Sequence, residues 1–162
     1  MKLKRAIAAI VLVSAFAAPV AAGTFEDAVD AHARGDYAKA LRLIRPLAND
    51  GDASAQFNLG LMYLTGQGVQ QDSAAAALWF RKAAEQGYAL AQSNLGTLYL
   101  YGRGVPQDYV RAYMWFSPSA AQGDQRAVKT LEMAERRITP AQINEAQKLA
   151  RDWKPATQPP PH

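Results

Sequence analysis

An internal repeat constrains the fold of this chain more than any other feature of its sequence. Residues 53–88 and residues 89–124 align without a gap at an offset of 36, and 19 of the 36 aligned pairs are identical. A repeat with a period of a few tens of residues indicates stacked supersecondary units, each of which packs its apolar face against its neighbours. The local structure of one unit therefore decides the architecture of the whole repeat region.

The spacing of residues in each unit predicts a pair of helices. In the first unit Ala55, Leu59 and Tyr63 recur at four-residue intervals, which places them on one helix face. Gly66 is suited to end this helix in the left-handed conformation, and Asp72 is suited to cap the free N–H groups of the next helix. The equivalent residues of the second unit are Ala91, Leu95, Tyr99, Gly102 and Asp108.

Small residues inside these helices predict where two helices approach each other. Gly60 and Gly96 fall in the middle of the first helix of each unit. Glycine at such a position costs about 1 kcal/mol relative to alanine, and a closely packed neighbouring helix explains why it is kept. Both glycines are therefore predicted contact points. The predicted packing stripe of the second helices consists of Ala76, Trp79, Phe80 and Ala84, and of Ala112, Trp115, Phe116 and Ala120.

The residues shared by the two units form the pattern AxAQxxLGxxYxxGxGVxxD, followed by AxxWF and AAxxG. This pattern resembles the Sel1-like repeat, a relative of the tetratricopeptide repeat, and both units carry nearly every signature position. The resemblance implies an all-α fold, a right-handed α/α solenoid in which helical hairpins stack side by side. It also implies an adaptor that binds another protein, and it names no particular partner.

The segments on both sides of the repeats are predicted to cap the solenoid, because an open terminal repeat would expose an apolar face. Residues 23–52 are interpreted as a degenerate tetratricopeptide-like hairpin with helices near 25–34 and 37–49. Residues 125–153 are interpreted as C-terminal capping helices. The proline-rich residues 154–162 cannot continue a helix and are predicted to form a disordered tail.

Two prolines mark the second half of the chain. Thr139, Pro140 and Gln142 form a helix-start pattern, so the last helix is predicted to begin there. Pro118 lies inside the second helix of its unit and removes a backbone hydrogen bond, which predicts a bend or an early helix end near Phe116. The apolar residues of the last helix, which should seal the end of the stack, are Ile143, Ala146, Leu149, Ala150 and Trp153.

The first residues have the pattern of a secretory signal peptide. Three basic residues, Lys2, Lys4 and Arg5, precede a 13-residue apolar run, which is shorter than the roughly 20 residues of a membrane-spanning helix. Residues 1–22 are therefore predicted to be a signal peptide that is cleaved after Ala22, with cleavage after Gly23 as a close competitor. Cleavage leaves a periplasmic or secreted protein without a stable membrane anchor. A short uncleaved anchor or a buried helix is the alternative interpretation.

Composition excludes several classes of partner and cofactor. The chain has 18 basic and 14 acidic residues, and removal of the leader leaves 15 against 14. A nearly neutral mature chain offers no general electrostatic attraction to nucleic acid, so no nucleic-acid partner is expected. The chain has no cysteine, so it forms no disulfide and no zinc site with cysteine ligands.

No catalytic, cofactor-binding or metal-binding residue is predicted. His32 is interpreted as a packing residue with a polar tip, and Asp72 and Asp108 as helix caps rather than an acid–base pair. The paired glycines of the turns follow helices rather than strands and lack the third glycine of a phosphate-binding loop. We therefore expect no enzyme. The alternative is a hydrolase of the exported Sel1-like type, directed at the cell wall or at β-lactams, but those relatives carry disulfides.

The predicted partner-binding surface is the concave face of the solenoid, which the first helices line in tetratricopeptide proteins. Phe57, Leu61 and Leu64 make this face more apolar than a solvated surface requires, and such patches mark interaction sites. The predicted contact residues are Phe57, Leu61, Leu64, Ser93, Thr97, Leu100, Tyr101, Arg126 and Lys129, flanked by Ser54, Thr65, Leu90 and Arg136. We expect a monomeric exported scaffold that holds a peptide or protein partner of the cell envelope. Two alternatives stay open: neighbouring helices cover the apolar residues, or the chain is a spacer without a ligand.

Overall fold

The computed structural model describes residues 24–155, which form eight α-helices and no strand. The helices are α1 (Phe25–Ala33), α2 (Tyr37–Asn49), α3 (Ala53–Thr65), α4 (Ser73–Glu85), α5 (Ala89–Tyr101), α6 (Tyr109–Ala121), α7 (Gln125–Glu135) and α8 (Pro140–Asp152). The predicted signal peptide lies outside the described residues, as does the predicted tail from residue 156 onward. Within the described part of the chain, no helix is both long and apolar enough to span a membrane.

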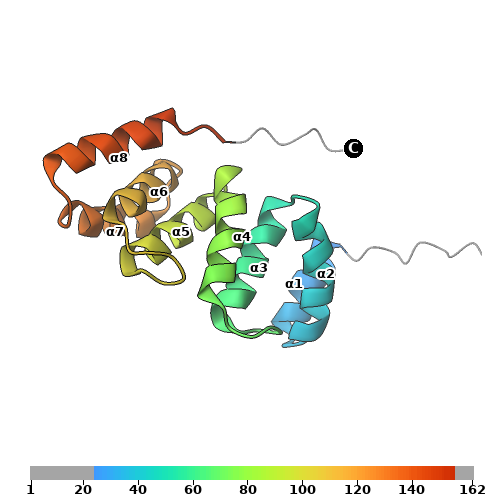
Figure 1. Cartoon of the computed structure of the whole chain (residues 1–162). Coiled ribbons are helices and arrows are strands. Elements are labelled where there is room, and N and C mark those ends of the chain that lie inside the picture. The colour runs from blue at the N-terminus through green and yellow to red at the C-terminus, as the bar shows by residue number, and fades with distance from the viewer. Residues whose placement is uncertain (1–23, 156–162) are drawn as a thin grey trace, which may run out of the picture.

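Each helix from α1 to α6 packs on the next one along the chain, so the hairpins form a single row. Figure 1 shows this row, with α1 and α2 at one end and α7 at the other. The all-helical row of hairpins is the predicted α/α solenoid. Two groups of buried side chains form its core, one between the first hairpin and α3 and the other from α3 to α8.

The helix ends are those that the capping residues predict. Asp72 accepts hydrogen bonds from two backbone N–H groups at the start of α4, and Asp108 accepts one from Arg111 at the start of α6. Gly66 and Gly102 end α3 and α5 in the left-handed conformation, with φ of 73° and 64°. Because both repeats use the same cap and the same terminator, their hairpins have the same length and stack in register.

The mid-helix glycines lie where helix and aromatic ring meet, as predicted. A Cβ atom added at Gly60 would lie 2.7 Å from the ring of Phe80, and one added at Gly96 would lie 2.8 Å from the ring of Phe116. Both rings are fully buried. The two helices of each hairpin can therefore approach closely only because these positions carry no side chain.

The predicted early end of the second helix near Pro118 is wrong. Helix α6 continues through Pro118 to Ala121. The proline removes one backbone hydrogen bond of the helix, but Phe116 and Ser119 on either side of it are buried. The Ser119 hydroxyl also donates a hydrogen bond to the carbonyl of Ala89, at 2.8 Å. Tertiary contacts on both sides of the proline thus hold the last turn of α6 in place.

The last helix begins at Pro140 behind the predicted Thr139–Gln142 capping box, but its position differs from the predicted one. It packs on α6 rather than pairing with α7 (Figure 1). Its buried face contains Ala146, and Trp153 makes an edge contact with Trp115, with 5.9 Å between ring centroids. Leu149, predicted to be on the packing face, is exposed. The helix therefore covers the flank of the second repeat and leaves Val128 and Met133 of α7 exposed.

Candidate partner-binding surface

The first helices of successive hairpins each have an outward side, and we call these sides together the first-helix face. In each helix it uses four positions spaced by four, three and four residues, which lie on one side of an α-helix. None of these residues is buried. They are Ser54, Asn58, Leu61 and Thr65 of α3, Leu90, Asn94, Thr97 and Tyr101 of α5, and Arg126, Thr130 and Met133 of α7 with Arg137 just beyond its C-terminal end.

Three residues of the predicted surface belong to the core instead. Phe57, Ser93 and Leu100 are 8%, 5% and 4% exposed, so little of each side chain is open to a partner. Phe57 packs against the rings of Phe80 and Tyr88, with centroid distances of 5.7 and 5.2 Å. The prediction was wrong because these positions of α3 and α5 face the following hairpin, which covers them.

The remaining predicted residues are accessible to different degrees. Leu61 and Leu64 are half-buried, Thr97 is partly exposed, and Tyr101 and Arg126 are exposed. Lys129 is exposed as well. It occupies the repeat position of Phe57 and Ser93, but no hairpin follows α7 to cover it.

Polar side chains on the first-helix face bond to their own helices. The amide of Asn58 donates to the carbonyl of Ser54 at 2.8 Å, and that of Asn94 donates to the carbonyl of Leu90 at 2.7 Å. Each amide keeps its carbonyl oxygen and a second N–H for another partner. The surface therefore presents one amide per repeat, at the same position in α3 and α5.

An apolar hollow opens on this face between the first hairpin and α3, and we call it the α1–α3 hollow. Its volume is about 140 Å³. Apolar side chains form most of it, and polar side chains lie at its edge. The lining residues are Ala28, Val29, Ala40, Ile44, Leu61 and Met62, with His32, Asn58, Thr65 and Gln67.

His32 belongs to a polar cluster at the edge of the α1–α3 hollow. Its Nε2 atom lies 2.8 Å from Oε1 of Gln67, and its ring meets that of Tyr37 edge-on, at 5.1 Å between centroids. The Gln67 amide donates to the Tyr37 hydroxyl at 3.3 Å. His32 is thus a packing residue with a polar tip, as predicted. Within residues 24–155, no group of three His, Cys, Asp or Glu side chains could hold a metal ion.

Buried glutamines join one hairpin to the next, a role that the sequence pattern did not indicate. The Gln56 amide donates to the carbonyl of Ala48 at 3.1 Å and accepts from Gln86 at 2.8 Å. Gln92 repeats this arrangement with the carbonyl of Ala84, at 3.3 Å, and with Gln122, at 3.0 Å. Both units contain the pattern AxAQ and end in Gln-Gly, with the same number of residues between the two glutamines. This shared spacing could have indicated that the glutamines act as a pair.

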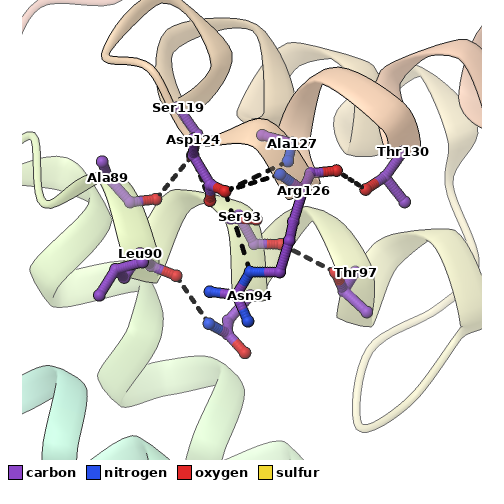
Figure 2. A network of polar contacts seen from close by, with 10 residues as sticks. All are labelled: Ala89, Leu90, Ser93, Asn94, Thr97, Ser119, Asp124, Arg126, Ala127 and Thr130. Atoms are coloured by element: carbon purple, nitrogen blue, oxygen red, sulfur yellow. Dashed lines mark hydrogen bonds and ion pairs between the residues drawn. The ribbon is translucent and has the colours of Figure 1, made fainter.

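Asp124 fixes the start of α7 and hence the last part of the first-helix face. Its carboxylate accepts hydrogen bonds from the backbone N–H groups of Arg126 and Ala127 and from the hydroxyl of Ser119 (Figure 2). Burial raises the pKa of Asp124, but these bonds and one from Ser93 outweigh it, so the pKa lies below the usual 3.8. The charged form therefore contributes to the folded state.

Equal helical hairpins stacked in one row define an α/α solenoid, a class of fold that offers long surfaces for binding proteins. The sequence profile of the Sel1 repeat matches residues 53–88 and 89–124. The chain therefore carries two Sel1 repeats and is a Sel1-repeat protein. This confirms the resemblance that the sequence pattern indicated.

Two solved structures have the same fold. A protective antigen present in uropathogenic Escherichia coli strains, which displays an SLR fold, has a TM-score of 0.76 and 34% identity, over 80% of this chain and 28% of that one. A Sel1 repeat protein from Oxalobacter formigenes has a TM-score of 0.67 and 24% identity, over 81% of this chain and 56% of that one. The chain thus spans less than two thirds of either protein. No curated protein matches it.

Proposed function

We propose that this chain is exported and acts as a scaffold, which binds a peptide segment of a cell-envelope protein along the first-helix face. The observation that carries the proposal is the α1–α3 hollow, an apolar site that opens on this face beside the side-chain amide of Asn58. The leader pattern of residues 1–22 supports export. The Sel1 repeats support protein binding, because a scaffold of this kind needs only a long surface.

The size of the hollow suits one apolar side chain of the partner. Its volume of about 140 Å³ is close to that of an engineered apolar cavity of roughly 150 Å³, which binds benzene. An aliphatic or aromatic side chain would contact Val29 and Leu61 there. The amides of Asn58 and Asn94, one repeat apart, would hydrogen-bond to the backbone of the same segment, as side-chain amides can donate and accept.

Site-specific crosslinking tests this proposal. A photo-crosslinking amino acid replaces Leu61 in one variant and Leu78 in another, because Leu78 is exposed on α4 and away from the first-helix face. We expect one envelope protein to crosslink at position 61 and not at position 78, and mass spectrometry to identify the joined segment. Val29→Asp should abolish that crosslink. Equal crosslinking at both positions, or an unchanged crosslink in Val29→Asp, would contradict the proposal.

Export and the enzymatic alternative are tested by separate measurements, protein mass for the first and β-lactam turnover for the second. The mass of the protein recovered from the envelope or medium should correspond to the chain from Gly23 onward. A full-length mass, or recovery from the cytoplasm alone, would contradict cleavage after Ala22. Incubation of the purified protein with a chromogenic β-lactam should give no turnover, and turnover would favour the hydrolase alternative.

A further inference from the structure

A second hollow lies on the first-helix face, two repeats away from the α1–α3 hollow. It opens between the C-terminal ends of α5 and α7 and the start of α6, and its volume is about 390 Å³. We call it the arginine hollow. Its lining residues are Leu100, Tyr101, Gln107, Tyr109, Met133, Arg136 and Arg137.

The arginine hollow combines an apolar surface with unpaired positive charge. Tyr101 and Met133 are 54% and 47% exposed. Ion pairs within the described residues join Arg111 to Asp108 and Arg126 to Asp124 and do not involve the arginines of the hollow. Nor do the guanidinium groups of those arginines make any hydrogen bond within residues 24–155.

A structural role alone does not account for the two arginines. Arg136 and Arg137 follow the last turn of α7, where the helix dipole favours cations. That effect places positive charge there, but it supplies no protein acceptor for the guanidinium donors, five N–H groups in each, which are exposed to solvent. Glu132 lies one helical turn before Arg136 and forms no ion pair with it. An arriving carboxylate would therefore meet free donors in a geometry that arginine binds with two parallel hydrogen bonds.

We propose that the arginine hollow binds an acidic part of the partner peptide, in which Asp or Glu side chains flank an aromatic or aliphatic residue. The acidic side chains pair with Arg136 and Arg137, and the apolar residue packs on Tyr101 and Met133. The inference deepens the proposed function and rests on it, since it concerns the same peptide on the same face.

Charge and register give the bound peptide a direction. Thr65 of the α1–α3 hollow and Tyr101 and Arg137 of the arginine hollow occupy equivalent repeat positions, so both hollows lie along one line. Helix α1 carries exposed acidic Glu26 and Asp30, whereas exposed Arg126, Arg136 and Arg137 lie on or beside α7. With helix spacings of 8–10 Å, two repeats span roughly 20 Å, or about six residues of extended peptide. The partner should therefore carry an apolar anchor and an acidic group about that far apart.

Two synthetic peptides provide the test. Each peptide contains a leucine and, about six residues further along, a three-residue motif. The motif is Glu-Phe-Glu in one peptide and Gln-Phe-Gln in the other. Affinity for the full chain is measured by calorimetry at low and high salt, and melting temperature reports on folding. We expect the acidic peptide to bind about five- to tenfold more tightly, with an advantage that falls as salt rises.

The decisive variant is Arg136→Gln with Arg137→Gln, and its matched control is Lys148→Gln with Arg151→Gln, which removes two exposed charges from α8. The first should eliminate the preference for the acidic peptide at an unchanged melting temperature, and the control should keep it. Undetectable binding of the acidic peptide to wild type, equal losses in both variants, or tighter binding of a DNA oligonucleotide through the same arginines would overturn the inference.

A third variant separates this inference from the proposed function. Suppose that Val29→Asp weakens the binding of both peptides, while the variant with Arg136→Gln and Arg137→Gln still prefers the acidic peptide. The arginine hollow is then not the acidic site, and the scaffold proposal stands. If the arginine variant removes the preference while Val29→Asp changes nothing, the acidic site stands and the α1–α3 hollow is not the anchor.

Discussion

The two Sel1 repeats share the glycine–phenylalanine contact of their interior and differ on their outward surface. Gly60 packs on Phe80 in the first repeat as Gly96 packs on Phe116 in the second. On the first-helix face, by contrast, Leu61 of α3 is replaced by Thr97 in α5, and Thr65 by Tyr101. The shared glycine and phenylalanine therefore maintain the stack, and the exposed positions that differ determine which part of a partner each repeat can bind.

The largest expected effect comes from removal of the buried rings. Phe80→Ala and Phe116→Ala should each lower the free energy of unfolding by about 3–5 kcal/mol, because each ring leaves a cavity in a fully packed site. Urea unfolding followed by circular dichroism measures both losses. Similar losses would support equivalent interiors, and a loss confined to one repeat would contradict the comparison.

The glycine contacts should give the next largest effect. Gly60→Ala and Gly96→Ala introduce a Cβ atom under 3 Å from an aromatic ring, and overpacking of this kind costs about 1–3 kcal/mol. The better helix propensity of alanine returns about 1 kcal/mol at most, so we expect a net loss of stability. Gly60→Ala in a Phe80→Leu background is the matched control. If the glycine variant is as stable as wild type in the original background, the ring does not set the helix spacing.

Acid should weaken the junction between the second repeat and α7, where Asp124 caps the helix. The equivalent residue between the two repeats is Tyr88, whose side chain makes no cap, so that junction should not respond in this way. The pKa of Asp124 lies below 3.8 in the folded chain, so its contribution is present above that pH and is lost as the pH falls through the folded value. Asp27, in the α1 capping box, shifts in the same direction.

Asp124→Asn keeps a capping side chain but removes the charge. We expect the variant to lose less stability than wild type when the pH falls from about 5 to about 3. Thermal unfolding across this range measures it. An identical pH dependence for both proteins would show that the Asp124 carboxylate does not stabilise the junction.

The smallest effect on stability is expected from an exchange of surface residues. Thr65→Tyr and Tyr101→Thr change only the first-helix face and should alter stability by less than about 0.5 kcal/mol. The exchange should nevertheless weaken binding of the acidic peptide, because Tyr101 is lost from the arginine hollow. A large loss of stability would mean that these exposed positions also hold the hairpins together, which contradicts the division between interior and surface.

Much of the fold could be predicted because it depends on local chemistry that recurs in both repeats. Asp72 and Asp108 fixed the start of the second helices, and Gly66 and Gly102 fixed the end of the first helices. Such signals act over a few residues, so one sequence suffices to interpret them. The repeat adds a second, independent example of each signal.

The candidate surface was predicted only in part, because exposure depends on the neighbouring hairpin. Phe57, Ser93 and Lys129 occupy the same repeat position, yet the first two are buried and the third is exposed. The difference is that α7 has no hairpin packed beyond it. Periodicity assigns a residue to one side of a helix, but it does not tell which side the next unit covers.

The amino-acid sequence by itself determined the helices, their caps and the close contacts at Gly60 and Gly96, since these follow from backbone preference and from residue size. Only the tertiary structure decided where α8 lies, that α6 continues through Pro118, and that two hollows open on one face. Those features arise from the packing of segments distant along the chain, where the sum of many weak contacts outweighs any single local preference.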